Sequence, residues 1–349
     1  MKDVKVYVGM SGGVDSSVTA ALLKQQGYDV TGVYMKNWSQ DLPGMVCPWK
    51  QDYQDAKRVA VQLDIPFKMY DFETEYRQKV VDYMVREYQA GRTPNPDIMC
   101  NQEVKFKLFL ETCLEDGADM IATGHYARTQ EGKLLTAANV EKDQTYFLYR
   151  VTSEALCRSL MPIGDFKTKD EVRAKAAELG LATAEKKDSQ GICFVGKVGI
   201  KDFLLHELGP QAHGDIVDQT GKVIGQHDGA IFYTIGQRHG LDVGGGLPYY
   251  VVGKDMAKNE VFVTTNLDDG RLWQQDLQVA DLHWINEAPK PGETYQVRTR
   301  YRAPLVDCTI ELQGDKVTIK LTDPARAITP GQSAVIYNAD QVLGGGIVI

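Results

Sequence analysis

The sequence has no uninterrupted apolar run of the roughly 18 residues that a membrane-spanning helix needs. We therefore expect no membrane contact, no secretory leader at the start Met1-Lys2-Asp3-Val4-Lys5, and a cytoplasmic location. Cysteine is scarce, with 6 in 349 residues and no C-x-x-C pair, which excludes a disulfide scaffold and argues against structural zinc. Basic residues are in deficit, since 39 Lys and Arg against 47 Asp and Glu give a net charge of −8. This balance excludes a protein that coats nucleic acid through bulk charge, but it leaves a local basic groove open.

The composition that remains is globular, and the length predicts two or three domains. Near the start, Val4, Val6 and Val8 alternate in a strand that ends at Gly9. Further strands are predicted at 29–34, 66–70 and 118–123, and helices at 17–26, 52–63, 74–89, 105–115 and 166–179. Strands that alternate with helices of this length predict an α/β domain with a doubly wound parallel sheet. Such a sheet binds ligands at the carboxyl ends of its strands.

The pattern changes after about Gly199. Glycine and short β-type runs (221–224, 249–252, 261–263) predict a small middle domain. From Trp273 onward, runs at 295–301, 308–312, 316–321, 333–337 and 344–349 predict a small β-sandwich or β-barrel, of which we choose the barrel. We divide the chain into a catalytic domain (1–199), a small central domain (200–272) and a C-terminal β-barrel (273–349).

A glycine-rich loop joins the first strand to the first helix, with the sequence Gly9-Met10-Ser11-Gly12-Gly13-Val14-Asp15-Ser16-Ser17. Unpaired N–H groups and the helix dipole favour an anion there, so phosphate binding is predicted. The loop lacks the lysine of the kinase-type P-loop, and its glycines do not fit the dinucleotide spacing G-x-G-x-x-G. A purely structural turn is the alternative. The string S-G-G-x-D-S resembles the pyrophosphatase loop (PP-loop) of adenylating enzymes, which cleave ATP between its α and β phosphates.

Two cysteines lie in polar segments. One is Cys100 in Thr93-Pro94-Asn95-Pro96-Asp97-Ile98-Met99-Cys100-Asn101, where we expect the prolines to present Asp97 and Cys100 on a stiff loop. The other is Cys193 in Lys186-Lys187-Asp188-Ser189-Gln190-Gly191-Ile192-Cys193-Phe194, where the two lysines would favour a thiolate. For Cys47, Cys113, Cys157 and Cys308 we expect the ordinary role of a small core residue. An adenylating loop together with two loop cysteines suggests sulfur insertion.

Taken together, the motifs resemble those of the tRNA-specific 2-thiouridylase family, of the PP-loop ATP pyrophosphatase superfamily. They are the S-G-G-V-D-S-S loop, P-N-P-D-x-x-C-N, T-G-H-Y-A (Thr123 to Ala127), K-D-Q-x-Y-F-L (Lys142 to Leu148), K-D-S-Q-G-I-C-F and G-Q-R-H-G-L (Gly236 to Leu241). With the β-rich tail, the resemblance covers essentially the whole chain.

The resemblance implies a sulfurtransferase that adenylates the 2-position oxygen of the tRNA wobble uridine and replaces it with sulfur. Its cofactors would be ATP and Mg²⁺, with Asp15 helping to hold the metal but no fixed metal site in the protein. Its partners would be tRNA and a persulfide donor, either a cysteine desulfurase or a sulfur-relay protein. Cys193 would carry the persulfide, and Cys100 would act as nucleophile and then form a disulfide with Cys193. Asp97 would be the general acid/base. The implied ATP-binding residues are Gly9, Met10, Ser11, Gly12, Gly13, Val14, Asp15, Ser16, Met35 and Gly124, and the implied target-base contacts are Asn95, Pro96 and Asp97. For Asp97, a capping role in an Asx turn is the alternative.

For tRNA recognition, period-two alternation in 297–303 places Arg298, Arg300 and Arg302 on one strand face, where they would meet a run of phosphates or simply be solvated. The tRNA contacts implied by the resemblance are His125, Lys142, Asp143, Gln144, Arg300, Tyr301 and Gln332. His125 also fits a structural histidine at a strand end. Gly236 to Gly240 fits either a capped turn or an RNA-contacting loop.

Two other functions remain to be separated from thiolation. A synthetase that aminates an adenylated carbonyl would need ammonia or an amino group, and it would stay active without Cys100 and Cys193. A non-catalytic RNA-binding protein would release no pyrophosphate from ATP. The intact Ser11, Gly12, Gly13, Asp15 and Ser16 count against it.

Overall fold

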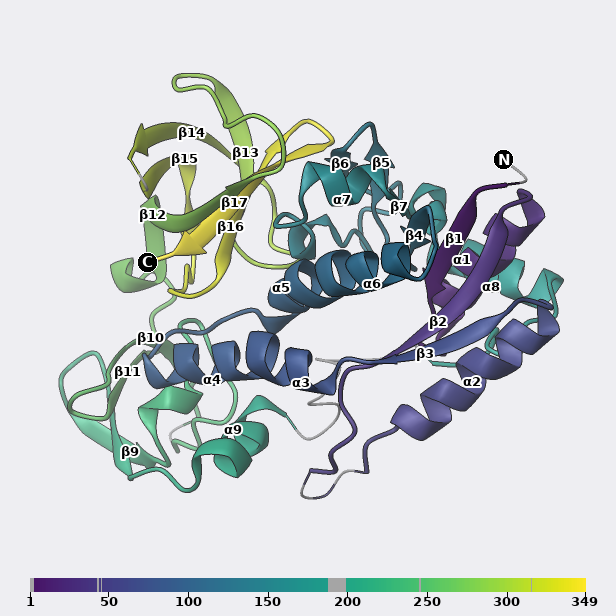
Figure 1. The fold of residues 1–349 in the computed structure, drawn as a ribbon. Coiled ribbons are helices and arrows are strands. Elements are labelled where there is room, and N and C mark those ends of the chain that lie inside the picture. The colour runs from purple at the N-terminus through teal and green to yellow at the C-terminus, as the bar shows by residue number, and fades with distance from the viewer. Residues whose placement is uncertain (1–2, 43, 45, 188–198, 245, 315) are drawn as a thin grey trace.

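The computed structural model describes residues 3–42, 44, 46–187, 199–244, 246–314 and 316–349. Its N-terminal part is a parallel sheet in the order β3-β2-β1-β4-β7 (Figure 1). The strands are β1 (Lys5–Gly9), β2 (Asp29–Lys36), β3 (Phe67–Asp71), β4 (Met120–Ala122) and β7 (Ser159–Leu160). The doubly wound parallel sheet predicted from the sequence is confirmed.

Helices cover both faces of this sheet, and the side chains of β1 alternate between the two faces. Val6 and Val8 enter one apolar cluster, which includes Val172, whereas Tyr7 enters a second cluster, which includes Phe109. The first cluster packs against α1 (Val14–Gln25), α2 (Trp49–Gln62) and α8 (Lys169–Glu178). The second packs against two long helical stretches, one made of α3 (Glu73–Tyr76), η1 (Arg77–Val81) and α4 (Asp82–Gln89), the other of α5 (Pro96–Met99), η2 (Cys100–Leu108) and α6 (Phe109–Glu115).

The helix that carries Cys100 begins earlier than the sequence predicted. It runs without a break from Pro96 to Glu115, and its segment η2 is π-helical. Asn95 caps it, since its side-chain Oδ1 accepts a hydrogen bond from Asp97 N at 3.2 Å. The placement of Cys100 on a stiff loop is therefore wrong: a proline in the first helical turn needs no N–H partner, so Pro96 starts the helix.

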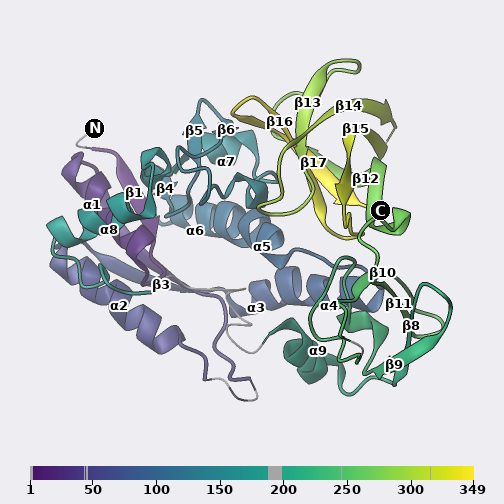
Figure 2. The ribbon, with the colours of Figure 1, turned by 180° about the vertical axis from the view of Figure 1, so that it is seen from behind.

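The middle part of the chain combines a helix, α9 (Ile200–Leu208), with a four-stranded sheet in the order β10-β11-β8-β9. The strands are β8 (Gly214–Val217), β9 (Val223–His227), β10 (Tyr250–Asp255) and β11 (Glu260–Thr264). Seen from both sides, this part lies beside α4 (Figures 1 and 2). Helix α9 and strand β8 were not predicted from the sequence.

The C-terminal part is a closed six-stranded barrel. Its strands are β12 (Trp273–Trp284), β13 (Thr294–Arg298), β14 (Val306–Gln313), β15 (Lys316–Arg326), β16 (Ser333–Asn338) and β17 (Gln341–Val348). They follow the order β12-β15-β14-β13-β16-β17, and pairing of β17 with β12 closes the barrel. The predicted β-barrel is confirmed. A hairpin of the N-terminal part, β5 (Arg128–Gln130) and β6 (Lys133–Leu135), extends the barrel sheet through β17.

One predicted strand, 295–301, ends early. Strand β13 stops at Arg298, and the chain turns through 299–302, with Arg302 at a φ of +63°. The expectation that Arg298, Arg300 and Arg302 share one strand face is therefore wrong, because the turn breaks the alternation.

Candidate active site

The glycine-rich loop leads from β1 into α1 at the carboxyl edge of the parallel sheet. Its serines hold its shape: Ser17 Oγ donates to Gly13 O at 2.8 Å, and Ser16 Oγ donates to the same oxygen at 3.2 Å. Ser11 N in turn donates to Ser16 Oγ at 3.2 Å. Gly13 is the N-cap of α1 and provides no side-chain cap, so the first-turn N–H groups are left for an anion.

Close packing around the loop requires glycine at two positions. A Cβ on Gly12 would lie 2.3 Å from the carbonyl oxygen of Asp52, and Gly12 has a φ of +75°. A Cβ on Gly124, which follows β4, would lie 2.7 Å from Ser16 N. Met35, near the end of β2, covers Gly9, where an added Cβ would be 2.9 Å from Met35 Cε. The structure thus brings the predicted ATP-binding residues of three separate segments together.

Asp15, in the first turn of α1, projects from this loop and has two partners. Lys169 Nζ, at the start of α8, lies 2.7 Å and 2.8 Å from its two carboxylate oxygens. The Tyr126 hydroxyl donates to Asp15 Oδ1 at 3.0 Å. The stretch Gly124-His125-Tyr126 therefore touches the loop at both of its ends.

Asp97 lies in the first turn of α5. Burial raises the pKa of its carboxyl group, and the positive charge of Lys105 opposes that rise. The same lysine acts on His125, whose pKa is lowered by burial first and by Lys105 second. Asp97 and His125 thus share one positively charged neighbour, and the histidine is held neutral.

His125 is almost fully buried. Its Nδ1 lies 2.8 Å from Thr123 Oγ1, and its ring packs against Phe106 with centroids 5.6 Å apart. A direct tRNA contact by this side chain stays a prediction.

Cys100 is 2% exposed and lies within the apolar cluster that contains Ile98 and Val104. Its neighbour Asn101 donates from Nδ2 to the carbonyl oxygen of Phe147 at 3.0 Å. The Phe147 ring packs against the Tyr301 ring with centroids 4.4 Å apart. The turn with Cys100 is thereby connected to a predicted tRNA contact on the barrel.

Cys193 lies in residues 188–198, outside the part of the chain that the structure describes. Just before that segment, Lys186 Nζ lies 2.8 Å from both Asp52 Oδ1 and Asp55 Oδ2 on α2. The charge of Lys186, which was expected to favour a thiolate at Cys193, is therefore already balanced by two carboxylates. Asp52 also packs its backbone against Gly12. Lys186, which pairs with Asp52, therefore lies beside the glycine-rich loop, called the ATP loop below.

The segment that leads into Asn95 lies where the three parts of the molecule meet. Thr93 N donates to Pro330 O at 2.9 Å, and Thr93 Oγ1 lies 3.1 Å from Thr234 Oγ1 of the middle part. Gln332 Nε2 donates to Thr93 O at 2.7 Å. Gln332, predicted to contact tRNA, thus also holds the chain just before Asp97.

The other predicted tRNA contacts are partly engaged within the protein. Asp143 is 4% exposed and accepts hydrogen bonds from Ala137 N at 2.7 Å and from Thr145. Gln144 Oε1 accepts from Tyr126 N at 2.9 Å, and Lys142 N bonds to Asn139. Asp143 also pairs with Arg298 at 3.7 Å. These contacts shape the K-D-Q motif beside Tyr126, and its tRNA role stays a prediction.

Arg300 donates from Nη2 to Thr329 Oγ1 at 3.0 Å and lies 3.4 Å from the carbonyl oxygen of Ile235. Arg302 instead packs its guanidinium over the ring of Tyr301, at 5.2 Å from the centroid. In the G-Q-R-H-G-L run, Gln237 caps the turn: its Oε1 accepts from Thr234 N, and its Nε2 donates to His239 O. Arg238 and His239 are exposed at its tip. Sequence reasoning left this run open between a capped turn and an RNA loop, and the capped turn is present.

Sequence reasoning missed two residues of this site, Lys105 and Lys169. Lys105 lies in η2, eight positions after Asp97, which is a spacing of roughly two helical turns. This spacing would have indicated Lys105 as a neighbour of Asp97 if the helix had been predicted to start at Pro96. No local signal marks Lys169, because its partner Asp15 is 154 positions away. Within the described residues, no group of three or more His, Cys, Asp or Glu side chains could hold a metal ion by itself.

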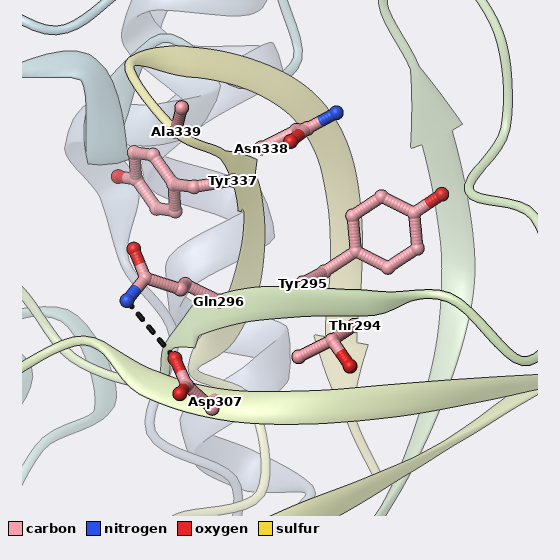
Figure 3. Close-up of a pocket in the computed structure, with 7 residues that line it drawn as sticks. All are labelled: Thr294, Tyr295, Gln296, Asp307, Tyr337, Asn338 and Ala339. Carbon is pink, nitrogen blue, oxygen red and sulfur yellow. Dashed lines mark hydrogen bonds between the residues drawn. The ribbon is translucent and has the colours of Figure 1, made fainter.

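A pocket of about 280 Å³ lies on the barrel and holds none of the predicted site residues (Figure 3). It is lined by Thr294, Tyr295, Gln296, Asp307, Tyr337, Asn338 and Ala339, and Gln296 Nε2 donates to Asp307 Oδ1 at 3.0 Å. We therefore place the candidate active site not in this pocket but at the sheet edge around the glycine-rich loop, where the predicted ATP-binding residues meet.

Among the helices that the structure describes, none has the length and apolar character needed to cross a membrane.

Three family models match successive parts of the chain. They are described as a tRNA methyl transferase HUP domain (residues 4–197), a tRNA methyl transferase PRC-barrel domain (201–265) and an aminomethyltransferase beta-barrel domain (274–348).

Similar proteins in other organisms are named tRNA-specific 2-thiouridylase MnmA. One from Geobacillus thermodenitrificans is 47% identical over 99% of this chain and 95% of its own length. Another from Levilactobacillus brevis is 48% identical with the same coverage. A solved structure of a 4-thiouridine synthetase–RNA complex with bound ATP shares 20% identity over 54% of this chain and 44% of its own, with a TM-score of 0.39, too low to support an argument.

Proposed function

This chain belongs to the tRNA-specific 2-thiouridylase family, and from that premise we propose that it catalyses ATP-dependent 2-thiolation of the wobble uridine of tRNA. The 2-position oxygen attacks the α phosphorus of ATP, and the bond to the bridging oxygen breaks, so that pyrophosphate leaves with the electron pair. Sulfur then displaces AMP to give 2-thiouridine. The catalytic domain is residues 1–199, the central domain 200–272 and the tRNA-docking barrel 273–349.

The observation that carries this proposal is the stretch Gly124-His125-Tyr126. Gly124 packs on the ATP loop at Ser16, and Tyr126 binds Asp15 of the same loop. Between them, the His125 ring packs against Phe106 of the helix that begins at Pro96 and carries Asp97, with ring centroids 5.6 Å apart. A nucleotide in the loop and a base at Asn95, Pro96 and Asp97 would therefore lie on either side of one short segment, as adenylation of a bound base requires.

The chain's residues fit ATP and Mg²⁺. The N–H groups of the first turn of α1 face a loop whose glycines leave no side chain in the way. Asp15 already accepts a cation on both carboxylate oxygens, so its donor set suits a hard metal. The metal would offset phosphate charge there. Gly9, Met10, Ser11, Gly12, Gly13, Val14, Ser16, Met35 and Gly124 would surround the nucleotide.

Sulfur transfer uses two thiols. The terminal sulfur of a persulfide on Cys193 attacks carbon 2, and AMP leaves. The Cys100 thiolate then attacks the inner sulfur of Cys193, so that a Cys100–Cys193 disulfide forms and the sulfur–sulfur bond to the product breaks. An external dithiol reduces the disulfide, and a persulfide donor protein in the cytoplasm reloads Cys193.

Asp97 would move the protons of this reaction. A carboxyl group whose pKa is raised by burial holds a proton closer to neutral pH, which suits a general acid/base. Because the chain carries a net charge of −8, tRNA binding would depend on placed contacts rather than on bulk charge. Those contacts are His125, Lys142, Asp143, Gln144, Arg300, Tyr301 and Gln332.

The test is mass spectrometry of tRNA nucleosides after incubation with ATP, Mg²⁺, a persulfide source and the protein. We expect 2-thiouridine with the wild type and with Cys157→Ser, which removes an exposed thiol, and none with Cys193→Ser or Cys100→Ser. Pyrophosphate release should persist in both inactive variants, because adenylation precedes sulfur transfer.

Other outcomes identify other functions. An aminated nucleoside that survives loss of both cysteines would identify the aminating synthetase. No pyrophosphate release from the wild type with tRNA would identify a non-catalytic RNA-binding protein.

A further inference from the structure

The ATP loop carries no positive side chain of its own. From Gly9 to Ser17 it has no lysine or arginine, and its one charged residue, Asp15, is negative. The phosphates of ATP bring several more negative charges to the same place. A cation from another segment is needed before such a loop binds a nucleotide well.

Lys169 provides that cation. Its ammonium lies 2.7 Å and 2.8 Å from the two Asp15 oxygens and 5.7 Å from the centroid of the Tyr126 ring. Its side chain is 13% exposed, against 31% for Asp15, so the pair is largely shielded from solvent on the lysine side and open on the carboxylate side. Charge pairs in such settings are screened less than surface pairs.

The position of Lys169 is fixed by a helix cap. Thr168 Oγ1 accepts from Glu171 N at 3.2 Å, and Glu171 Oε2 accepts from Lys167 N at 2.9 Å, so the first turn of α8 is held from both sides. Helices α8 and α1 pack against each other in the same apolar cluster. The ammonium group therefore has a set place relative to the loop.

We propose that Lys169 is a nucleotide-binding and positioning residue of the adenylation step: it neutralises Asp15 before ATP arrives and then supplies the positive charge for the departing pyrophosphate. This inference rests on the proposed function. Lys169 takes no part in the covalent step, so it changes neither the bonds made nor the bonds broken. Its positive charge stabilises the negative charge that develops on the departing pyrophosphate beside the ATP loop.

The experiment compares Mg·ATP binding by calorimetry, without tRNA, in the wild type, Lys169→Gln, Lys169→Arg and Lys175→Gln. Lys175 is the matched control, since it lies on the same helix in an ion pair with Glu178. We expect Lys169→Gln to bind ATP about 10- to 100-fold more weakly and to require more Mg²⁺, because a charge-assisted contact is lost. Lys169→Arg should recover part of the affinity, and Lys175→Gln should match the wild type.

The double variant Asp15→Asn with Lys169→Gln separates binding from stability. It is compared with Asp15→Asn alone, which already lacks the carboxylate proposed to hold Mg²⁺. If Lys169 only balances Asp15 in a structural ion pair, adding Lys169→Gln to Asp15→Asn should cause no further loss of ATP affinity. Our proposal predicts a further loss of affinity, with a melting temperature no lower than that of Asp15→Asn.

Wild-type ATP affinity and Mg²⁺ dependence in Lys169→Gln, or an affinity in the double variant equal to that of Asp15→Asn, would overturn the inference and leave the proposed function standing. A wild-type protein that binds no Mg·ATP would instead overturn the proposed function, and the inference with it.

Discussion

Gly124 shows how tightly single residues are placed around the ATP loop. A Cβ at this position would lie 2.7 Å from Ser16 N and 2.9 Å from the carbonyl carbon of Asp15, both backbone atoms that cannot turn aside. We predict that Gly124→Ala loses about 1–3 kcal/mol of stability through overpacking and weakens ATP binding. Thermal unfolding and ATP titration would measure both effects. Gly244→Ala is the control, because an added Cβ there meets nothing within 4 Å. Wild-type behaviour of Gly124→Ala would contradict the close contact.

Asp97, the proposed general acid/base, is expected to lower the stability of the protein at neutral pH. Burial raises the pKa of its carboxyl group in the folded state above the ordinary value of 3.8. At pH values just above 3.8, the folded state therefore binds more protons than the unfolded state. Stability from this group therefore falls as pH rises through that window and stays lost at neutral pH.

Asp97→Asn remains neutral, so we predict a higher melting temperature than wild type at pH 7 and about 10²- to 10⁴-fold less thiolation. Melting curves at pH 4 and pH 7, with thiolation assays on the same samples, would test this. The gain in melting temperature should shrink at pH 4, and a variant less stable than wild type at pH 7 would contradict the explanation.

At the level of elements, the start of the helix at Pro96 can be tested at its cap, Asn95. Its Oδ1 caps Asp97 N, and it is also a proposed contact of the target base. We predict that Asn95→Ala loses about 1 kcal/mol through the missing cap, whereas Asn95→Ser keeps most of that stability. Both should lose thiolation if the amide contacts the base. Chemical denaturation gives the first comparison and the nucleoside assay the second, and full activity in Asn95→Ser would restrict Asn95 to capping.

The sequence predicted the parallel sheet well because its strands and helices alternate with clear periods, as in β1 and α1. It missed the start of the helix at Pro96 because two nearby prolines were taken as helix breakers, although one of them suits a first turn. It carried strand β13 too far, since alternation of Arg298, Arg300 and Arg302 continues where the backbone turns. Local patterns do not report such turns.

The candidate site was predictable where its residues lie in one motif, as in the ATP loop. It was not predictable where partners come from distant segments, as with Lys169 and Asp15 or Gln332 and Thr93. Those contacts exist only because the fold brings the start of α8 to the ATP loop, and the barrel to the segment before the helix that begins at Pro96.

At the scale of the whole molecule, the three parts are joined rather than strung together. Strand β17 of the barrel pairs with β6 of the N-terminal part, with Val342 opposite Leu134. Thr93 contacts the middle part through Thr234 and the barrel through Pro330. A tRNA docked on the barrel, as we propose, would therefore be linked through Pro330 and Thr93 to the segment before Asp97. We also expect the three parts to unfold in a coupled manner.

Each of the three parts also contains one histidine with a lowered pKa: His125 in the N-terminal part, His227 in the middle part and the partly buried His283 in the barrel. Burial is the main cause in all three. For His227, Nδ1 also accepts a hydrogen bond from Gly229 N at 2.9 Å, which fixes the neutral form. In the unfolded chain these histidines become protonated near their ordinary pKa of 6.5. In the folded chain they become protonated only at lower pH.

We therefore predict that stability falls as pH drops from 7 through 6.5 toward 5, in all three parts, by up to about 1.4 kcal/mol per pH unit for each histidine. Carboxylates with lowered pKa, such as Asp269 beside Arg271 at about 2, add their loss only at more acidic pH. Hydrogen exchange read part by part at pH 7 and pH 5.5 would test this, and His227→Gln should flatten the pH response most in the middle part. Equal protection at both pH values would show that the folded protein protonates these histidines as readily as the unfolded chain does.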